Sequence, residues 1–286
     1  MGIVLTTESG SDLTKESCER HHILTVPFGL NFPDRTVEDG QIPVQEIYDF
    51  YRDTRTIPKT NAVSPYQYTE FFKAVAAQNP ESEIIHIGYS SACSCSFQNA
   101  VLGVRDLQND NIKVHLIDSL NVSGGLGNLV LKAAELAERS PEKTAEELVR
   151  DILPCVKKVH TSFVPDTLDF LLAGGRVSNA AAIGAAILKI KPRIDIVGGK
   201  LLAVKKYRGK MEKIAYRFVD DFLEGRNFDK SRIYLFYAEG ASLDMIGQIQ
   251  KYLEEKGFEE VRVGVLGCVM TVHGGKGAIG MSAMEM

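Results

Sequence analysis

The sequence lacks an apolar run that is long enough to cross a membrane. Its longest apolar stretches, such as residues 180–188, reach only about half of the roughly 20 residues that a transmembrane helix needs. No charged and then apolar leader precedes a cleavage site at the amino terminus. We therefore expect a cytoplasmic protein that does not insert stably into a membrane.

Positive charge and cysteine are also scarce. The 33 Lys and Arg residues are outnumbered by 37 Asp and Glu residues, and a net charge of −4 creates no general attraction for nucleic acid. Five cysteines, an odd number, do not suggest a disulfide framework and suit a reducing compartment. Cys93 and Cys95 have no second Cys or His pair at ligand spacing, so we expect no metal site.

What the sequence does contain is material for a sizeable hydrophobic core. It has 286 residues, of which 44% are hydrophobic and 24% are charged, as in ordinary soluble globular proteins. A chain of this length exceeds the comfortable size of one core. Two domains are therefore expected.

Short apolar runs alternate with helical patterns through the first half of the chain, which is the rhythm of βαβ units. These elements predict an α/β fold whose amino-terminal domain, residues 1–157, is Rossmann-like with a parallel sheet. Its helices are expected to have N-caps at Ser11 and Ser64. The expected strands are residues 3–5, 23–26, 83–88 and 113–117, and the expected helices are residues 12–20, 65–77, 96–107 and 127–139.

Two stretches depart from this rhythm. Residues 28–58 carry prolines and turn signals around one helix at 44–52, and we interpret them as an inserted subdomain. A further capped helix begins at Ser140, after which residues 158–286 are predicted to form an α+β domain with a largely antiparallel sheet. A turn at 198–199 makes one hairpin in it. The strands expected there are residues 160–164, 193–197, 201–205, 231–238 and 261–266.

The segment 88–100 places hydroxyls and small side chains where a buried strand passes into a helix. At such a junction, the free N–H groups of the helix and the positive end of its dipole favour a carboxylate or a phosphate. Ser94 and its neighbouring serines add donors, although serines at this position also act simply as helix caps. Thr60 and Asn61 occupy a second loop before a helix that starts with proline. Because such loops converge on one crevice in open α/β sheets, the two loops are expected to hold one head group.

These two segments, together with others along the chain, resemble motifs of the DegV family of bacterial fatty-acid-binding proteins. Thr7-Glu8-Ser9 is similar to the family's T-D-S, Thr60-Asn61 opens a loop of the T-S-Q-P-S type, and residues 90–100 are similar to S-S-x-L-S-G-T-Y-Q-S-A. The order of the motifs is shared over nearly the whole chain. The others are Asp118-Ser119, Gly124-Gly125-Leu126-Gly127, Asp166-Thr167-Leu168, Gly174-Gly175-Arg176-Val177-Ser178, Lys191-Pro192, Arg208-Gly209 and residues 273–278.

The resemblance implies a lipid carrier that is not an enzyme and needs no cofactor. A long-chain fatty acid, such as palmitate, would have its carboxylate held by Thr60 and Ser94 and its tail buried between the domains. In several bacteria such proteins serve as the acyl-carrying subunit of a fatty-acid kinase, so a kinase partner is implied. The departures from the family pattern are Asn61 in place of Ser, Cys93 and Cys95 in place of Leu and Gly, and Lys276 in place of Pro.

Further roles follow from the same resemblance. Arg176 and His273 match positions near the head group or the pocket mouth, with Asn61 beside Thr60. An apolar helix at 180–188 is expected to be buried, because it is apolar on every face. Its small residues suit either close helix packing or a tunnel wall, in which Ala182, Ile183, Ala185 and Ala186 would face the acyl chain. Arg208 lies in a basic cluster, residues 205–210, that is expected to dock the kinase.

One enzymatic alternative remains open on the sequence alone. Residues 88–92 approximate the G-x-S-x-G motif after a strand, and Asp118 and His273 follow in the order Ser, Asp, His. The alternative to a carrier is therefore a serine acyl hydrolase with Ser90 as nucleophile, although Ala92 stands where the motif has its last glycine. An independent phosphotransferase is disfavoured, because the sequence contains neither a P-loop nor an acidic cluster suited to Mg²⁺.

Overall fold

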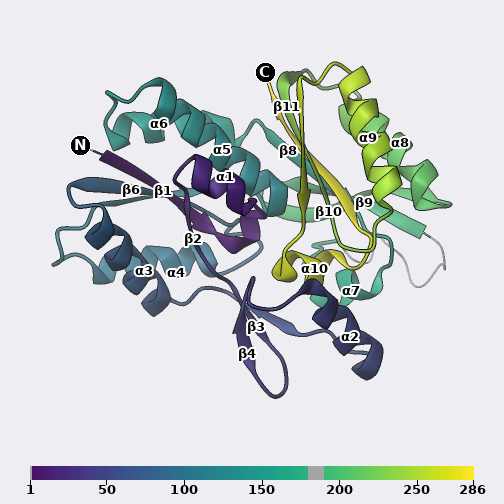
Figure 1. The fold of residues 1–286 in the computed structure, drawn as a ribbon, viewed down its shortest axis with the longest axis horizontal. Coiled ribbons are helices and arrows are strands. Elements are labelled where there is room, and N and C mark those ends of the chain that lie inside the picture. Colours follow the sequence, from purple (N-terminus) through teal and green to yellow (C-terminus); the bar gives the residue numbers. More distant parts are fainter. Residues whose placement is uncertain (1, 180–189) are drawn as a thin grey trace.

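The computed structural model describes residues 2–179 and 190–286, and it places two β-sheets side by side (Figure 1). The first sheet has four parallel strands in the order β2-β1-β6-β7. In Figure 1, helices α1, α5 and α6 lie above this sheet, and α3 and α4 lie below it. The bounds are β1 (Gly2–Glu8), β2 (Leu24–Val26), β6 (Ser82–Gly88), β7 (Val114–Asp118), α1 (Lys15–Arg20), α3 (Pro65–Gln78), α4 (Ser96–Asp106), α5 (Ser123–Arg139) and α6 (Ala145–Val156).

Strand β6, in the interior of the parallel sheet, is largely apolar on both faces. In β6, Ile84, Ile85 and Ile87 are all buried, as expected for a strand covered by helices on either side. Helix α3 begins as predicted: Ser64 and Gln67 form a capping box, and Pro65 occupies the first helical position. The predicted α/β class and the parallel first sheet are confirmed.

Three predicted helix starts are wrong. Helix α1 is capped by Thr14 rather than Ser11, which belongs to a short 3-10 turn, η1 (Ser9–Ser11). Helix α6 is capped by Thr144 rather than Ser140, four residues later than predicted. Helix α5 begins at Ser123 rather than residue 127. Glycines at its start look unfavourable locally, but a Cβ at Gly125 would overlap the Thr161 hydroxyl of the second sheet.

The segment between β2 and α3 forms a small antiparallel sheet of its own. Its strands, β3 (Gly29–Asn31), β4 (Thr36–Glu38) and β5 (Lys59–Asn61), lie in the order β4-β3-β5. The predicted helix at 44–52 is confirmed as α2 (Val44–Thr54), whereas the three short strands were not predicted. In Figure 1 this segment lies below both larger sheets.

The second sheet has six strands in the order β10-β9-β8-β13-β11-β12. All neighbours are antiparallel except β11 and β12, so the predicted, largely antiparallel sheet is confirmed. Its central strand β13 was not predicted. The bounds are β8 (Val159–Val164), β9 (Ile190–Val197), β10 (Lys200–Arg208), β11 (Phe228–Tyr237), β12 (Glu260–Val265) and β13 (Ile279–Glu285).

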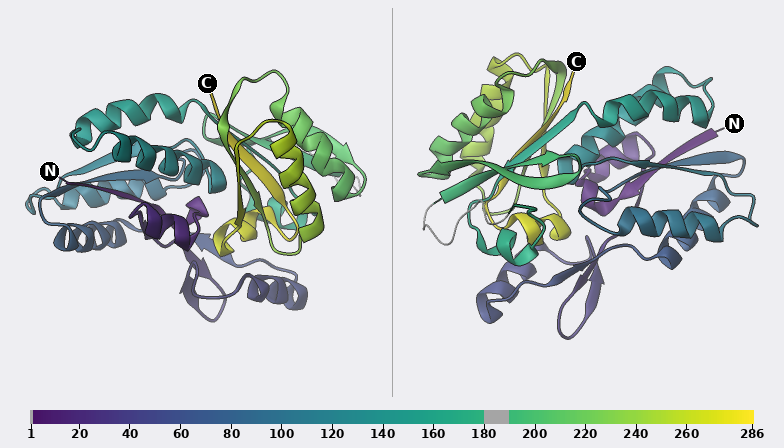
Figure 2. Two further views of the ribbon diagram at one scale, coloured as in Figure 1. Left: turned by 45° about the horizontal axis from the view of Figure 1, so that its top comes forward. Right: turned by 180° about the vertical axis from the view of Figure 1, so that it is seen from behind.

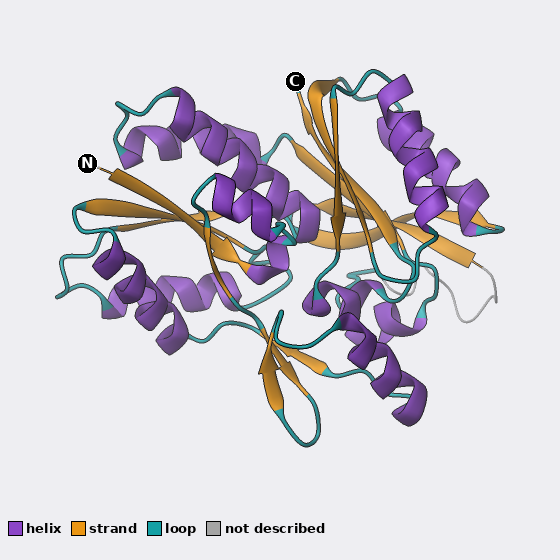
Figure 3. Cartoon of the chain, viewed as in Figure 1, coloured by secondary structure: helices purple, strands orange, loops and turns teal. Residues whose placement is uncertain are grey.

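Helices cover the second sheet and join it to the first. Figures 2 and 3 show α8 (Met211–Leu223) and α9 (Leu243–Glu255) on its outer face, with α7 (Asp169–Gly174) and α10 (Cys268–Gly274) at one end. Helix α5 contacts β1 and β6 of the first sheet and β8, β11 and β13 of the second. Buried residues of both sheets, such as Ile87 and Phe236, consequently share one hydrophobic cluster. Within residues 2–179 and 190–286, no helix has the length and apolar character needed to span a bilayer.

Candidate functional site

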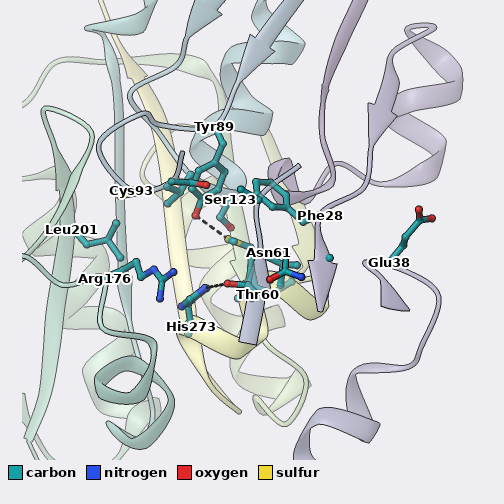
Figure 4. Close-up of a pocket in the computed structure, with 18 of the residues that line it drawn as sticks. Phe28, Glu38, Thr60, Asn61, Tyr89, Cys93, Ser123, Arg176, Leu201 and His273 are labelled. Carbon is teal, nitrogen blue, oxygen red and sulfur yellow. Dashed lines mark hydrogen bonds between the residues drawn. The ribbon is translucent and has the colours of Figure 1, made fainter. Parts of the chain in front are cut away.

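A cavity of about 920 Å³ lies where the two sheets meet the inserted three-stranded sheet (Figure 4). This volume falls within the usual range of small-molecule pockets. Three distant parts of the chain meet in its wall. The rings of Phe28 and Tyr89 pack edge to face with centroids 5.4 Å apart, and the Tyr89 hydroxyl donates to the sulfur of Met270 at 3.7 Å. These contacts join the inserted segment, the end of β6 in the first sheet, and α10 in one wall of the cavity.

Much of the cavity wall is apolar. The side chains come from the segment between β2 and α3, from β8, β10, β11 and β13 of the second sheet, from α10 and from residues next to these elements and to α5, and they have no polar group to offer a ligand. Such a surface favours an alkyl or other hydrocarbon group. The members of this apolar lining are Phe28, Val37, Val122, Phe163, Leu201, Phe236, Leu266, Val269, Met270, Ala278 and Ile279.

Both hydroxyl-bearing loops predicted from the sequence reach this cavity. Thr60 and Asn61 line it from β5, and Ser94 lines it from the loop between β6 and α4. Ser94 is half-buried, and its Oγ accepts the N–H of Ser96 at 3.1 Å while its hydroxyl hydrogen can point elsewhere. Asn61 is held by Asn31, whose side-chain amide donates to Asn61 Oδ1 at 3.1 Å.

His273 of α10 meets Thr60 directly. Thr60 Oγ1 and His273 Nε2 lie 3.0 Å apart, and His273 Nδ1 is buried without a hydrogen-bond partner in the described part of the chain. Burial of the ring, together with the positive charge of Arg176, lowers the pKa of His273 to about 4. The imidazole is therefore neutral at pH 7. An unpaired acceptor is more readily tolerated than an unpaired donor, so we assign the proton to Nε2. The histidine then donates to Thr60 and leaves the threonine hydrogen available to a ligand.

Arg176 brings a positive charge to the same wall. It follows α7 and a left-handed Gly175 with φ 64°, and its guanidinium donates to the carbonyl of Gly174 at 2.6 Å. The side chain is exposed and lines the cavity, and Figure 4 shows it beside His273. A guanidinium in this position favours an anionic group nearby.

The structure does not assemble the hydrolase triad that the sequence left open. Ser90 is fully buried and donates to the carbonyl of Gly199 at 2.7 Å, in the turn between β9 and β10. Asp118 accepts the backbone N–H groups of Ser91 and Leu120, and His273 is bonded to Thr60. No hydrogen bond joins Ser90, Asp118 and His273 in the regions that the structure describes.

The remaining predicted residues lie elsewhere. Arg208 is the exposed last residue of β10 and is not part of the cavity wall. The proposed tunnel helix at 180–188, with Ala182, Ile183, Ala185 and Ala186, lies outside the described residues. Cys93 lines the cavity, where its thiol donates to the Gly199 carbonyl at 2.9 Å and burial raises the pKa of the thiol. The described residues contain no group of three or more His, Cys, Asp or Glu side chains that is suited to a metal ion.

Sequence reasoning missed most of the apolar lining. Phe236 lies in the buried second half of β11, and Val269 and Met270 come from a seven-residue helix that was not predicted. The only local signal was the apolar run at 268–272 directly before His273. No local pattern distinguishes Phe236 from an ordinary core residue.

Comparison with known proteins identifies the family and the fold. Residues 2–286 match the family described as "Uncharacterised protein, DegV family". A DegV domain-containing protein of Clostridium perfringens is 31% identical over 274 residues, which cover 96% of this chain and 95% of that protein. Among solved structures, a fatty-acid-binding DegV family protein from Thermus thermophilus is 26% identical and superposes with a TM-score of 0.85 over 100% of both chains. The linoleic-acid-loaded fatty acid kinase B3 protein of Streptococcus pneumoniae, 20% identical, shares the fold with a TM-score of 0.84 over 100% of both chains.

Proposed function

The chain belongs to the DegV family, and on this premise we propose that it is a carrier that binds a long-chain fatty acid, such as palmitate, without transforming it. The observation that carries the proposal is the composition of the cavity wall. Apolar side chains of the second sheet, of α10 and of the segment between β2 and α3 share one cavity with hydroxyl, imidazole and guanidinium groups. This combination suits an amphipathic ligand with one anionic end.

The tail supplies most of the affinity in this proposal. Burying a methylene group is worth roughly 0.8 kcal/mol, so a sixteen-carbon chain gains on the order of 10 kcal/mol before the costs of association. The apolar lining, including Phe163, Phe236 and Leu266, is the surface proposed to receive it. The residues of 180–188 were proposed as a further wall on sequence grounds alone.

The head group supplies orientation. A buried carboxylate without hydrogen bonds is very costly, so it needs donors. We assign this role to the hydroxyls of Thr60 and Ser94, with Asn61 and His273 supporting the Thr60 side and Arg176 balancing the charge. A neutral His273 suits this arrangement, because its Nε2–H group donates a hydrogen bond to the Thr60 hydroxyl and does not bind the carboxylate itself.

We further propose that the bound acid is presented to a separate kinase in the cytoplasm. In this proposal the kinase binds the nucleotide and transfers the phosphate, and the carrier only holds the acid. Arg208 lies outside the cavity wall on the exposed end of β10, as a docking residue would. The competing hydrolase function has less support, because the Ser90 hydroxyl is already bonded to a backbone carbonyl.

Native mass spectrometry tests the proposed function. Protein purified without added lipid is expected to carry a non-covalent ligand whose mass matches a long-chain fatty acid, and denaturation should release it. A covalent serine-hydrolase probe provides the second arm and should leave Ser90 unlabelled. Protein that stays ligand-free and binds no added fatty acid would contradict the proposal, and labelling of Ser90 would favour hydrolysis.

A further inference from the structure

Glu8 is a buried carboxylate that does not line the cavity. It is the last residue of β1, at the carboxyl end of the first sheet, and its side chain is 0% exposed. A buried carboxylate is costly unless it is fully hydrogen-bonded. Its partners therefore show which parts of the fold depend on it.

Glu8 accepts hydrogen bonds from three donors. Its Oε1 accepts the Tyr68 hydroxyl at 2.6 Å and the Ser96 hydroxyl at 3.3 Å. Its Oε2 accepts the backbone N–H of Tyr89 at 2.9 Å. The Tyr68 and Ser96 hydroxyls also lie 2.8 Å from each other, so the single hydrogen of Ser96 is shared between Tyr68 and Glu8.

Two of these donors mark the ends of the loop that carries Ser94. Tyr89 directly follows β6, and Ser96 is the first residue of α4. The N–H of Ser96 donates to Ser94 Oγ at 3.1 Å, so Ser96 links Ser94 to the Glu8 carboxylate. The two oxygens of Glu8 thus hold both ends of the loop 89–96.

The third donor connects Glu8 to the segment that carries Thr60. Tyr68 lies in the first turn of α3, which follows β5 and the segment 62–64. A second link runs parallel to it, because the Asn99 side chain of α4 donates to the carbonyl of Val63 at 2.8 Å. Helices α3 and α4 pack so closely at this point that a Cβ on Gly103 would lie 2.8 Å from that of Tyr68. The two hydroxyl-bearing loops are consequently fixed relative to each other.

A carboxylate is the side chain best suited to this position. It offers acceptors only, whereas a glutamine would direct an N–H group at one of the three donors. Hydrogen bonds to an ionised acceptor are also stronger than those between neutral groups. Among the described residues, the only basic group within ion-pair distance is His86, whose Nε2 lies 3.7 Å from Glu8 Oε1. The hydrogen bonds to the loops are therefore the main interactions of this carboxylate.

We propose that Glu8 is a positioning residue for the head-group site, which sets Ser94 relative to Thr60 so that both hydroxyls meet a single carboxylate. The inference rests on the proposed function and deepens it. Glu8 does not contact the ligand in this account. Its effect is confined to the polar end of the pocket, and this distinguishes it from a residue that only stabilises the fold.

The test compares two ligands with the same tail and different heads. Hexadecanoic acid and 1-hexadecanol are titrated into the wild type and into Glu8→Gln. We expect the Kd for the acid to rise about ten-fold in Glu8→Gln, while the Kd for the alcohol stays within about two-fold. Ser96→Ala removes one donor to Glu8 and should give a smaller loss of the same kind. It also keeps the test decisive if Glu8→Gln fails to fold.

Thr7→Val is the matched control. Thr7 is the neighbouring residue on β1, is equally buried, and donates to the carbonyl of Ile87 within the sheet rather than to either loop. Its loss should change both Kd values by similar factors. Equal losses for acid and alcohol in the Glu8 and Ser96 variants, or unchanged acid binding in a folded Glu8→Gln, would overturn the inference. Wild-type protein that binds neither ligand would instead overturn the proposed function itself.

Discussion

Thr60 Oγ1 and His273 Nε2 lie 3.0 Å apart, although 213 positions separate the two residues in the sequence. The contact joins the inserted sheet to a short helix at the end of the second sheet, across the wall of the cavity. Together with Ser94, which also lines the cavity, these two side chains form its polar end.

The contact predicts that His273 acts through Thr60 and as a neutral group. His273→Ala should weaken the binding of hexadecanoic acid about ten-fold, because the Thr60 hydroxyl loses its donor. His273→Gln restores an N–H group and should recover part of the loss. Since the pKa of His273 is lowered to about 4, neither effect should change between pH 6 and pH 8. The control is His160→Gln, which alters a histidine paired with Glu285 outside the cavity wall. Wild-type affinity in His273→Ala would refute the role.

The hydroxyls themselves give the second prediction. Ser94→Ala, and less strongly Thr60→Val, should weaken acid binding by about 1.5–3 kcal/mol, which corresponds to roughly ten- to a hundred-fold in Kd. Thermal unfolding should be little changed, because neither side chain is fully buried. Ser91→Ala, an exposed serine of the same loop, is the control for isothermal titration. Two folded variants with parental affinity would place the carboxylate elsewhere.

The third prediction concerns the tail. Val122 lies in the apolar wall at the start of α5 and is 5% exposed. Val122→Phe should occupy space meant for the distal methylenes, each worth about 0.8 kcal/mol. Affinity for a sixteen-carbon acid should therefore fall more than affinity for a ten-carbon acid, as measured by competition binding. Leu153→Phe on the exposed face of α6 should leave the ratio unchanged. An unaltered ratio in Val122→Phe would move the tail out of this part of the cavity.

A buried aspartate near the cavity gives a prediction about stability. Burial raises the pKa of Asp12 to about 7, against the hydrogen bonds from Ser123 at 2.5 Å and from the N–H of Gly267 at 2.8 Å. A carboxyl group with a raised pKa stabilises the fold fully below about pH 4 and loses this contribution as the pH rises to about 7. Asp12→Asn removes the titration and keeps the left-handed backbone, φ 51°, accessible.

The stability of Asp12→Asn relative to wild type should therefore increase as the pH rises from 4 to 8. The expected change in the difference between their free energies of unfolding is on the order of 3 kcal/mol. Urea unfolding at several pH values measures the difference. The exposed Asp34→Asn should show a shift of no more than about 0.5 kcal/mol. A difference between Asp12→Asn and wild type that does not vary with pH would contradict the raised pKa.

The fifth prediction tests kinase docking. Arg208→Ala should leave fatty-acid binding within about two-fold and slow kinase-dependent formation of acyl phosphate, more strongly at low salt because exposed charges are screened at high salt. Arg105→Ala, at the exposed last turn of α4, is the charge-matched control. Normal transfer would remove Arg208 from the docking surface, and a parallel loss of binding would place it in the lipid site.

The sequence predicted those elements whose pattern is local. The parallel strands are apolar on both faces, and Ser64 and Pro65 mark the start of α3, so both were recognisable. Strand β13 was missed because residues 279–284 are all buried and include a glycine, which leaves no alternation to detect. Thr14 rather than Ser11 caps α1, because the left-handed Asp12 separates a 3-10 turn from the helix.

The residues of the candidate site likewise fall into those with a local sequence pattern and those that depend on contacts between distant segments. The sequence directs attention to Thr60 and Ser94 because each precedes a helix that starts nearby, and both reach the cavity, Thr60 from β5 and Ser94 from the loop before α4. The network around Glu8 was not foreseen, because Tyr68, Tyr89 and Ser96 reach it from three separate segments. The same holds for Phe236 and Met270, whose exposure to the cavity depends on how the sheets meet.

A crystal structure of the protein with hexadecanoic acid would show whether Thr60 and Ser94 hold the carboxylate. We expect one carboxylate oxygen about 2.5–3.0 Å from Thr60 Oγ1 and a carboxylate oxygen at a similar distance from Ser94 Oγ. The tail should run along the apolar wall formed by residues such as Phe163 and Phe236. A carboxylate bound away from both hydroxyls, or an acid bound outside this cavity, would contradict this expectation.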